Sequence, residues 1–169
     1  MGYNVEGNKL VSVVDSVKQL SVVTIPETVT SIENSAFERC FGIVEVINKS
    51  ALDITLGSPD NGNIARYALG VTKGESELIR QGDFLFYQNS DGMHLVKYLG
   101  SDKNVTLPDS FRGEIYKIHD LAFFSKVTVE SVVIPEGITH VGYKAFELCT
   151  SLQSVTIPST LTEFSDSAF

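Results

Sequence analysis

Apolar and polar residues follow a pattern that returns along the chain with a nearly constant period. In residues 20–41, LSVVTIPETVTSIENSAFERCF, a short apolar run ends in Ile-Pro, and Ala-Phe follows ten residues after the proline. The same order returns from residue 129 as VESVVIPEGITHVGYKAFELCT and from residue 152 as LQSVTIPSTLTEFSDSAF. Pro135 and Pro158 are 23 residues apart, and a period of roughly 20 to 29 residues is typical of a solenoid. The pattern therefore predicts stacked coils.

Each copy of the pattern predicts one strand followed by a tight return. Val23 and Ile25 are expected to point into the coil, because successive side chains of a strand alternate between its two faces. Pro26 should end the strand, since proline has no N–H to donate to the ladder. We interpret residues 34–37 as a short helical turn, capped by its asparagine or serine, in which Phe37 fills the coil interior.

The repeat is interrupted after residue 47. Asn48-Lys49 replaces Ile-Pro, and the next 55 or so residues carry no copy of the pattern. In this stretch we predict a short helix over 64–69 that Gly70 ends, and a β-hairpin around the turn at 89–92. The repeat resumes at residue 104, where four additional residues, 111–114, precede its Ala-Phe. We expect an N-terminal cap in residues 1–19, repeats in 20–47, an insertion in 48–103 and repeats again in 104–169.

The pattern I-P-x-x-[VIL]-T-x-[IVF]-x-x-x-A-F-x-x-C resembles that of the BspA-type leucine-rich repeat family. The resemblance covers roughly residues 20–47 and 104–169, and the hairpin segment FLFYQNSDGMHLVKYLG is similar to one that those proteins carry. The expected fold is an α+β repeat. We predict a short leucine-rich-repeat β-solenoid of about five coils with a parallel sheet on one face, and an α+β insertion that contains a β-hairpin.

The family resemblance implies a location and a general function. Its members are found widely on bacterial surfaces and in some mucosal parasites, where they bind other macromolecules and sometimes host matrix proteins. We therefore expect an extracellular or cell-surface protein. The opening residues MGYN are polar and unlike a secretion signal, so we expect any such signal to lie outside this sequence, and the end at Phe169, inside a repeat, suggests a fragment. The family defines no catalytic residues and no common ligand.

The net charge and the composition of the chain limit the classes of partner that it is expected to bind. The formal net charge is −8 at pH 7, which argues against a nucleic-acid or anionic-membrane partner, because these require a basic face. The chain is 43 % hydrophobic and 20 % charged, as in an ordinary folded protein. No apolar run approaches the ~20 residues that a membrane span needs, so we expect no membrane insertion.

A search for chemistry nominates no catalytic, cofactor-binding or metal-ligating residue. Cys40 and Cys149 occupy the same slot of different repeats, so we interpret both as buried apolar residues and expect no disulfide. The three histidines, His94, His119 and His140, show no ligand spacing and are expected on the surface. Carboxylates are spread singly along the chain, and no nucleophile or phosphate-binding motif is present. We expect no enzyme and no cofactor; catalysis within the insertion is the third and weakest alternative.

The remaining candidate site is the outward side of the strands, where rigid β-strands can hold side chains for a partner. The positions expected to bind a macromolecule, a host or matrix protein or a glycan, are Val22, Thr24, Glu45, Asn104, Thr106, Ser131, Val133, Ser154 and Thr156. The alternative is that valine and threonine stand there for strand propensity alone. The second candidate is the insertion, with its aromatic hairpin and the loop 72–82. The leading function is a non-catalytic adhesion-type module, and the alternative is a structural spacer in a larger surface protein.

Overall fold

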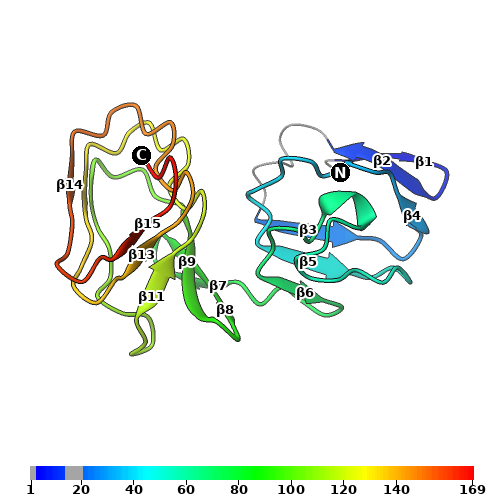
Figure 1. Ribbon diagram of the computed structural model, residues 1–169, viewed down its shortest axis with the longest axis horizontal. Helices are drawn as coiled ribbons and strands as arrows, with labels where there is room; N and C mark the ends of the chain where they lie inside the picture. Colours follow the sequence, from blue (N-terminus) through cyan, green and yellow to red (C-terminus); the bar gives the residue numbers. More distant parts are fainter. Residues whose placement is uncertain (1–2, 14–20) are drawn as a thin grey trace. The chain divides into compact units, whose positions relative to one another are not determined.

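The computed structural model describes residues 3–13 and 21–169, which form short β-strands and a single 3-10 turn over Asn61–Asn63 (Figure 1). The rest of the predicted N-terminal cap, residues 1, 2 and 14–19, lies outside the described residues. The chain divides into two compact units, Met1–Glu77 and Leu78–Phe169. Each unit is described by itself below.

The first unit contains two three-stranded sheets. One is parallel, in the order β3-β5-β6, and the other is β1-β2-β4, in which β1 and β2 form an antiparallel hairpin and β2 pairs in parallel with β4. The strands are β1 (Tyr3–Glu6), β2 (Lys9–Val13), β3 (Val22–Ile25), β4 (Ser31–Ile32), β5 (Glu45–Asn48) and β6 (Gly70–Thr72). β6 lies in the range that the sequence assigned to the insertion, yet it extends the β3–β5 sheet in parallel.

The second unit repeats this plan. One parallel sheet has the order β10-β12-β14, and the other has the order β15-β13-β11-β9-β8-β7, in which β7, β8 and β9 are antiparallel. The strands are β7 (Ile79–Gln81), β8 (Phe84–Asn89), β9 (Gly92–Tyr98), β10 (Asn104–Thr106), β11 (Tyr116–Ile118), β12 (Ser131–Val133), β13 (His140–Val141), β14 (Ser154–Thr156) and β15 (Glu163–Phe164). The predicted hairpin at 84–98 is thus present as β8 and β9.

A β-hairpin precedes the repeats in both units, and its second strand joins the sheet formed by the second strand of each coil. β2 pairs with β4 in the first unit, and β9 pairs with β11 in the second. The β8–β9 hairpin also supplies core side chains, since Phe86, Leu95 and Tyr98 are all at most 1 % exposed. Each hairpin therefore covers one end of the apolar interior that a stack of coils would otherwise leave open.

The predicted β-solenoid is confirmed, with parallel sheets on two sides of the coils. The predicted helix over 64–69 is wrong: these residues form a turn and bends, and Gly70 begins β6. Residues 34–37 do form a turn, but it is not helical throughout. The residue before Ala-Phe has a left-handed φ in every copy, between 53° and 65° at Ser35, Leu121, Lys144 and Ser167. A second left-handed residue follows four positions later at Arg39, Ser125 and Leu148. Left-handed residues interrupt the right-handed dihedrals that an α-helix requires.

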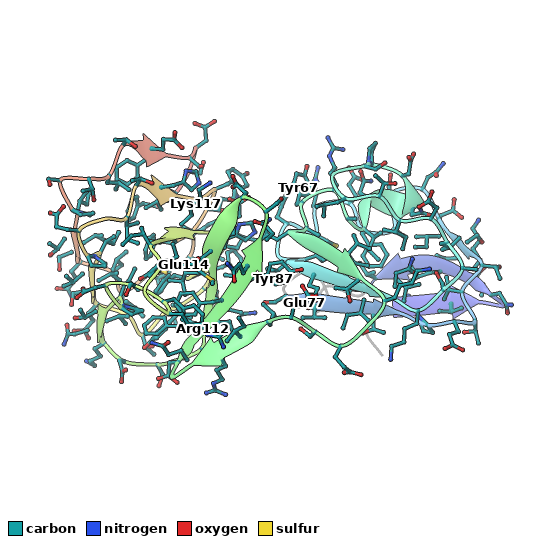
Figure 2. The ribbon with its side chains drawn as sticks, turned by 90° about the horizontal axis from the view of Figure 1, so that it is seen from below. Tyr67, Glu77, Tyr87, Arg112, Glu114 and Lys117 are labelled. Carbon is teal, nitrogen blue, oxygen red and sulfur yellow. The ribbon has the colours of Figure 1, made fainter. Side chains whose placement is uncertain are left out.

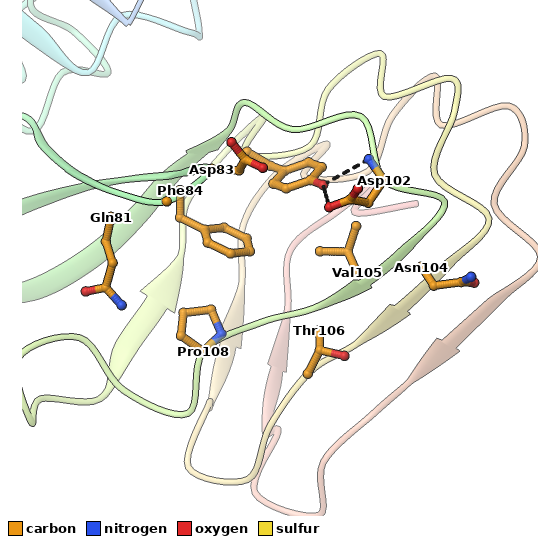
Figure 3. A pocket seen from close by; sticks show the side chains of 10 residues that line it. Gln81, Asp83, Phe84, Asp102, Asn104, Val105, Thr106 and Pro108 are labelled. Carbon is orange, nitrogen blue, oxygen red and sulfur yellow. Dashed lines mark hydrogen bonds between the residues drawn. The ribbon is translucent and has the colours of Figure 1, made fainter.

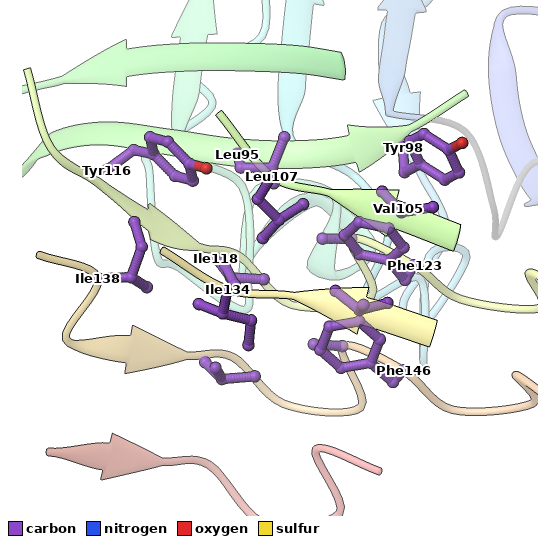
Figure 4. Packing of buried hydrophobic residues seen from close by; sticks show 14 of the residues in the cluster. Leu95, Tyr98, Val105, Leu107, Tyr116, Ile118, Phe123, Ile134, Ile138 and Phe146 are labelled. Atoms are coloured by element: carbon purple, nitrogen blue, oxygen red, sulfur yellow. The ribbon is translucent and has the colours of Figure 1, made fainter. Parts of the chain in front are cut away.

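Aromatic side chains from successive coils stack through the second unit. Tyr98, Phe123 and Phe146 lie one above the other (Figure 4), with ring centroids 5.0 Å and 4.9 Å apart. This spacing is close to the ~4.8 Å between neighbouring strands, so the aromatic rings follow the same stacking as the backbone. Phe37 plays the equivalent role in the first unit and is fully buried. The predicted interior position of the Ala-Phe phenylalanine is confirmed.

Departures from the repeat pattern have local structural roles. Asn48 is buried at the end of β5, and its side-chain oxygen accepts hydrogen bonds from the N–H and hydroxyl of Ser50 at 3.0 Å and 2.6 Å. This Asx-turn replaces the proline that ends the strand in other coils. Lys126, in the slot that cysteine holds elsewhere, donates to the Gly100 carbonyl at 3.0 Å. Cys40 and Cys149 are free thiols buried in the core, as predicted.

Candidate functional site

Six of the predicted partner-binding residues lie together on one sheet of the second unit. We call this surface the strand face: it consists of the outward side chains of β10, β12 and β14, namely Asn104, Thr106, Ser131, Val133, Ser154 and Thr156. Parallel pairing aligns them in two rows, Asn104–Ser131–Ser154 and Thr106–Val133–Thr156. Five are exposed or largely exposed and Ser131 is half-buried. The strand face is therefore a flat, accessible surface without a formal charge.

Hydrogen bonds between coils hold the strand face in place. The Ser131 hydroxyl donates to the Asn104 side-chain oxygen at 2.7 Å, and Lys103 forms a 2.6 Å ion pair with Glu130 beside it. At the other end of the strands, the Glu136 carboxylate accepts bonds from the N–H and hydroxyl of Ser159 at 3.0 Å and 2.9 Å. These bonds lower the pKa of Glu136. Side chains fixed in this way lose little conformational entropy when a partner binds.

The three predicted site residues of the first unit do not form a comparable surface. Val22 is half-buried, Thr24 is exposed, and Glu45 is completely buried. The segment after β6 folds over the β3-β5-β6 sheet, so that the Glu45 carboxylate accepts bonds from the Ser76 hydroxyl at 2.5 Å and the Glu77 N–H at 2.9 Å. The prediction that Glu45 is available to a partner is wrong, because a segment distant in sequence covers it.

Glu45 should accordingly act as an anchor for residues 73–77. We expect Glu45→Ala to destabilise the first unit by about 1–3 kcal/mol, because it removes two hydrogen bonds to a buried carboxylate. The amide of Glu77 should exchange its hydrogen faster, measured by hydrogen–deuterium exchange. Thr24→Ala, on the neighbouring strand of the same sheet, should cost under ~1 kcal/mol. Equal effects of the two substitutions in urea titrations would contradict this assignment.

A pocket adjoins the strand face at the edge of β10 (Figure 3). Its volume is about 310 Å³, and Asn104 and Thr106 belong to both the pocket and the strand face. The end of β7, the turn after it and the start of β8 add Gln81, Asp83 and Phe84, and Asp102 also lines the pocket. Amide and carboxylate groups around an aromatic ring can hydrogen-bond hydroxyl groups while the ring packs against an apolar surface. Gln81 belongs to the loop 72–82 that the sequence indicated as part of the second candidate site, whereas Asp83 and Asp102 were not singled out.

The histidines gather on the outward side of the second sheet. β-pairing places His94 beside Lys117 and His140 beside Glu163, on four consecutive strands. Lys117 (labelled in Figure 2) donates to Asp91 at 2.6 Å, and this bond lowers the pKa of the Asp91 carboxyl. The prediction of scattered surface histidines is wrong for His94, which is 5 % exposed.

Burial is the main cause of a lowered pKa in two of these histidines, His94 and His119. The rings of His94 and His119 meet edge to face with centroids 5.7 Å apart. Removal from water disfavours the charged imidazolium and is the largest reason that the pKa of each falls to about 4; the neighbouring His119 contributes to the shift of His94, and His140 to that of His119. The His119 Nε2 atom is buried without a hydrogen-bond partner among the described residues. Both side chains are therefore neutral at pH 7.

Other features of the described chain bear on its chemistry. In residues 3–13 and 21–169, no three histidine, cysteine or acidic side chains come together as a metal site. The same residues contain no helix long and apolar enough to cross a membrane.

The two units define a repeat protein built from parallel β-solenoid coils. A family model described as "BspA type Leucine rich repeat region" matches residues 13–57 and 100–169 in six copies. The chain therefore belongs to the BspA-type leucine-rich repeat family, as its Ile-Pro and Ala-Phe pattern predicted. The six copies exceed by one the five coils expected from the sequence.

Several solved structures are similar to the chain. The T. pallidum leucine-rich repeat protein TpLRR is 26 % identical, with a TM-score of 0.48, over 51 % of this chain and 42 % of TpLRR. A leucine-rich cell surface protein from Faecalibacterium prausnitzii A2-165 is 21 % identical (TM-score 0.45), over 89 % of this chain and 39 % of its own. The pneumococcal vaccine antigen PcpA is 16 % identical (TM-score 0.46), over 85 % and 40 %. No curated protein matches the sequence.

Proposed function

We propose that the chain is a non-catalytic binding module of the adhesion type, and that it recognises a macromolecule through the strand face. The observation that carries the proposal is the alignment of six small, mostly exposed side chains on β10, β12 and β14. A partner can lie flat against such a surface without displacing charged side chains from water. The expected partner is a host or matrix protein or a glycan.

The pocket beside β10 adds specificity to this proposal. A flat face of serine, threonine and valine offers contact area, whereas the pocket offers Gln81, Asp83 and Asp102 as hydrogen-bonding groups near Phe84. Such a combination suits a glycan or a polar side chain that projects from a protein partner. The shared residues Asn104 and Thr106 allow a partner to contact both surfaces at once.

Family membership supports an extracellular or cell-surface location, because proteins of this repeat type are found widely on bacterial surfaces. A structural spacer is the alternative function, and one observation favours it. Valine and threonine suit a pleated strand whatever binds to it, so Val133 and Thr156 do not require a partner. The two functions differ in whether the isolated chain binds anything.

The proposal is tested with a variant that places a row of charge on the strand face. We expect the triple variant with Thr106→Glu, Val133→Glu and Thr156→Glu to lose binding to a panel of matrix proteins and to a glycan array. Its three carboxylates would be buried at the interface without partners of opposite charge. The matched control carries Thr128→Glu, Thr139→Glu and Thr150→Glu, at exposed positions off the strand face. It has the same number of added carboxylates and should bind as the wild type does.

Each result separates the alternatives. Loss of binding in the strand-face variant alone, with both variants folded by circular dichroism, supports the proposal. Binding that survives in the strand-face variant contradicts it and moves the contact elsewhere on the chain. Absence of any binding by the wild type favours the spacer.

A further inference from the structure

A different pocket lies in the first unit, where the turns of two successive coils meet. The Phe37 N–H of the first turn donates to the Gly62 carbonyl of the second at 2.8 Å. The turns approach closely because Gly62 has no side chain: a Cβ atom there would lie 2.5 Å from the Glu33 carbonyl oxygen. We call the pocket beside them the arginine pocket. It has a volume of about 260 Å³, and its lining includes Ser35, Arg39, Phe41, Asn63, Arg66 and Tyr67.

The two arginines of this pocket have no acidic partner in the part of the chain that the structure describes. Arg80 pairs with Asp83 at 3.7 Å, whereas Arg39 and Arg66 form no ion pair with any residue of 3–13 or 21–169. Glu38 also lines the pocket and offsets part of its positive charge. The chain has four arginines and a net charge of −8, so the pocket is a local concentration of positive charge that attracts an anionic group.

Hydrogen-bond donors predominate around the arginine pocket. The Arg66 guanidinium donates to the Asn63 side-chain oxygen at 3.2 Å and lies 5.5 Å from the centroid of the Tyr67 ring. These contacts fix the guanidinium and leave the amide NH₂ group of Asn63 as a donor. The Ser35 hydroxyl forms no hydrogen bond with another described residue. Guanidinium, amide and hydroxyl donors around one space are the complement of an oxyanion, which accepts several hydrogen bonds.

Two aromatic rings form the apolar part of the arginine pocket. The ring centroids of Phe41 and Tyr67 are 4.9 Å apart, and Tyr67 (labelled in Figure 2) is 38 % exposed. An exposed ring can pack against the C–H groups of a sugar, whereas the carboxylate of a protein side chain has no comparable apolar face beside it. Pockets that bury a whole drug-sized ligand span roughly 300–1,000 Å³. This pocket therefore suits a single unit of a larger molecule.

We propose that the arginine pocket binds an acidic sugar unit of a glycan, through a carboxylate or sulfate group on the sugar ring. Arg39 and Arg66 bind the oxyanion, because a planar guanidinium matches two of its oxygens. Ser35 and Asn63 donate to its remaining oxygens or to a ring hydroxyl. Tyr67 packs against the apolar side of the sugar. No residue of this site belongs to the strand face, so the inference does not depend on the function proposed for that surface.

NMR titration of the amide signals of the 169-residue chain tests the proposal. The acidic probes are methyl glucuronide and a glucose sulfate. The comparison compounds are methyl glucoside, which is neutral, sodium sulfate, which has no sugar ring, and N-acetyl-aspartate amide, which represents an acidic protein side chain. Both acidic sugars should bind more tightly than all three comparison compounds, and added NaCl should weaken their binding because salt screens the charges.

Substitution of either arginine of the pocket should weaken the binding of both acidic sugars. Arg39→Gln and Arg66→Gln each remove a charged donor to the oxyanion, so we expect the dissociation constant to rise by about tenfold. The matched control is Arg112→Gln. Arg112 is also exposed, has a left-handed φ and lies over an aromatic ring, 5.3 Å from the centroid of Phe111. It is not part of the arginine pocket and its substitution should leave binding unchanged.

The proposal is supported if only the two pocket variants lose affinity, with all variants folded by circular dichroism and with the strand-face variant binding the acidic sugars as the wild type does. It is overturned if the wild type binds neither acidic sugar, or binds methyl glucoside as tightly. Equal affinity for sodium sulfate would define a general anion site and overturn the assignment to a sugar. Tighter binding of N-acetyl-aspartate amide would overturn it in favour of an acidic protein partner.

Discussion

Phe123→Ala should destabilise the second unit by ~3–5 kcal/mol, in the range of other large-to-small core substitutions. Phe123 is fully buried, and its ring lies between Tyr98 at 5.0 Å and Phe146 at 4.9 Å. Truncation leaves a cavity in the middle of the stack, so both neighbours lose contacts at once. Urea titration followed by far-UV circular dichroism measures the change in the free energy of unfolding.

The adjacent phenylalanine provides a matched control for this prediction. Phe124 follows Phe123 directly and is only half-buried. Phe124→Ala removes the same atoms from the neighbouring position, and we expect it to cost under ~1.5 kcal/mol because less apolar area returns to water. Similar losses for the two variants would show that the repeat register, and with it the assignment of Phe123 to the core, is wrong.

Acidification from pH 7.5 to pH 5 should lower the free energy of unfolding by roughly 2–4 kcal/mol through His94 and His119. The folded-state pKa of each is about 4, below the ordinary 6.5. The unfolded chain therefore takes up protons below pH 6.5, whereas the folded chain takes them up only near pH 4. Their stabilising contribution is fully present above pH 6.5 and is lost as the pH falls from 6.5 to 4.

Variants at the same cluster isolate this effect. His94→Gln with His119→Gln should remove most of the loss between pH 7.5 and pH 5, measured by urea titration at both values. His140→Gln, at the half-buried histidine beside Glu163, should leave the loss in place. Carboxyls with a lowered pKa, such as Asp91 and Glu136, destabilise the fold only below their ordinary range of about 4. A loss unchanged in the double variant would refute the histidine assignment.

The coil interior could be predicted because it is encoded by a local pattern. Val23, Ile25 and Phe37 recur at the repeat period, and the structure buries all three. The non-helical conformation of the turns at 34–37 and 64–69 could not be predicted in the same way. The turn before Ala-Phe is too short for a stable helix on its own, and its left-handed residue is a serine, leucine or lysine, whose identity gives no signal for that conformation.

The candidate site was predicted only in part, for a similar reason. The two rows on β10, β12 and β14 follow from strand alternation and from repeats that keep neighbouring strands in register, with an offset of 27 residues from Asn104 to Ser131 and of 23 from Ser131 to Ser154. The pocket includes side chains from the turn between β7 and β8, whose position beside β10 depends on how the hairpin packs on the coils. No periodicity relates Asp83 to Asn104.

The sequence by itself determined that this protein is a repeat solenoid of the BspA type, which side chains fill its coils, and which strand positions point outward. Only the tertiary structure decided which outward positions remain accessible. Glu45 is covered by residues 76 and 77, and His94 meets His119 through the pairing of β9 with β11. The direction in which a side chain points is a property of a single strand, because successive residues of a strand alternate between its two faces. Accessibility depends on segments distant in the chain, whose contacts no local pattern records.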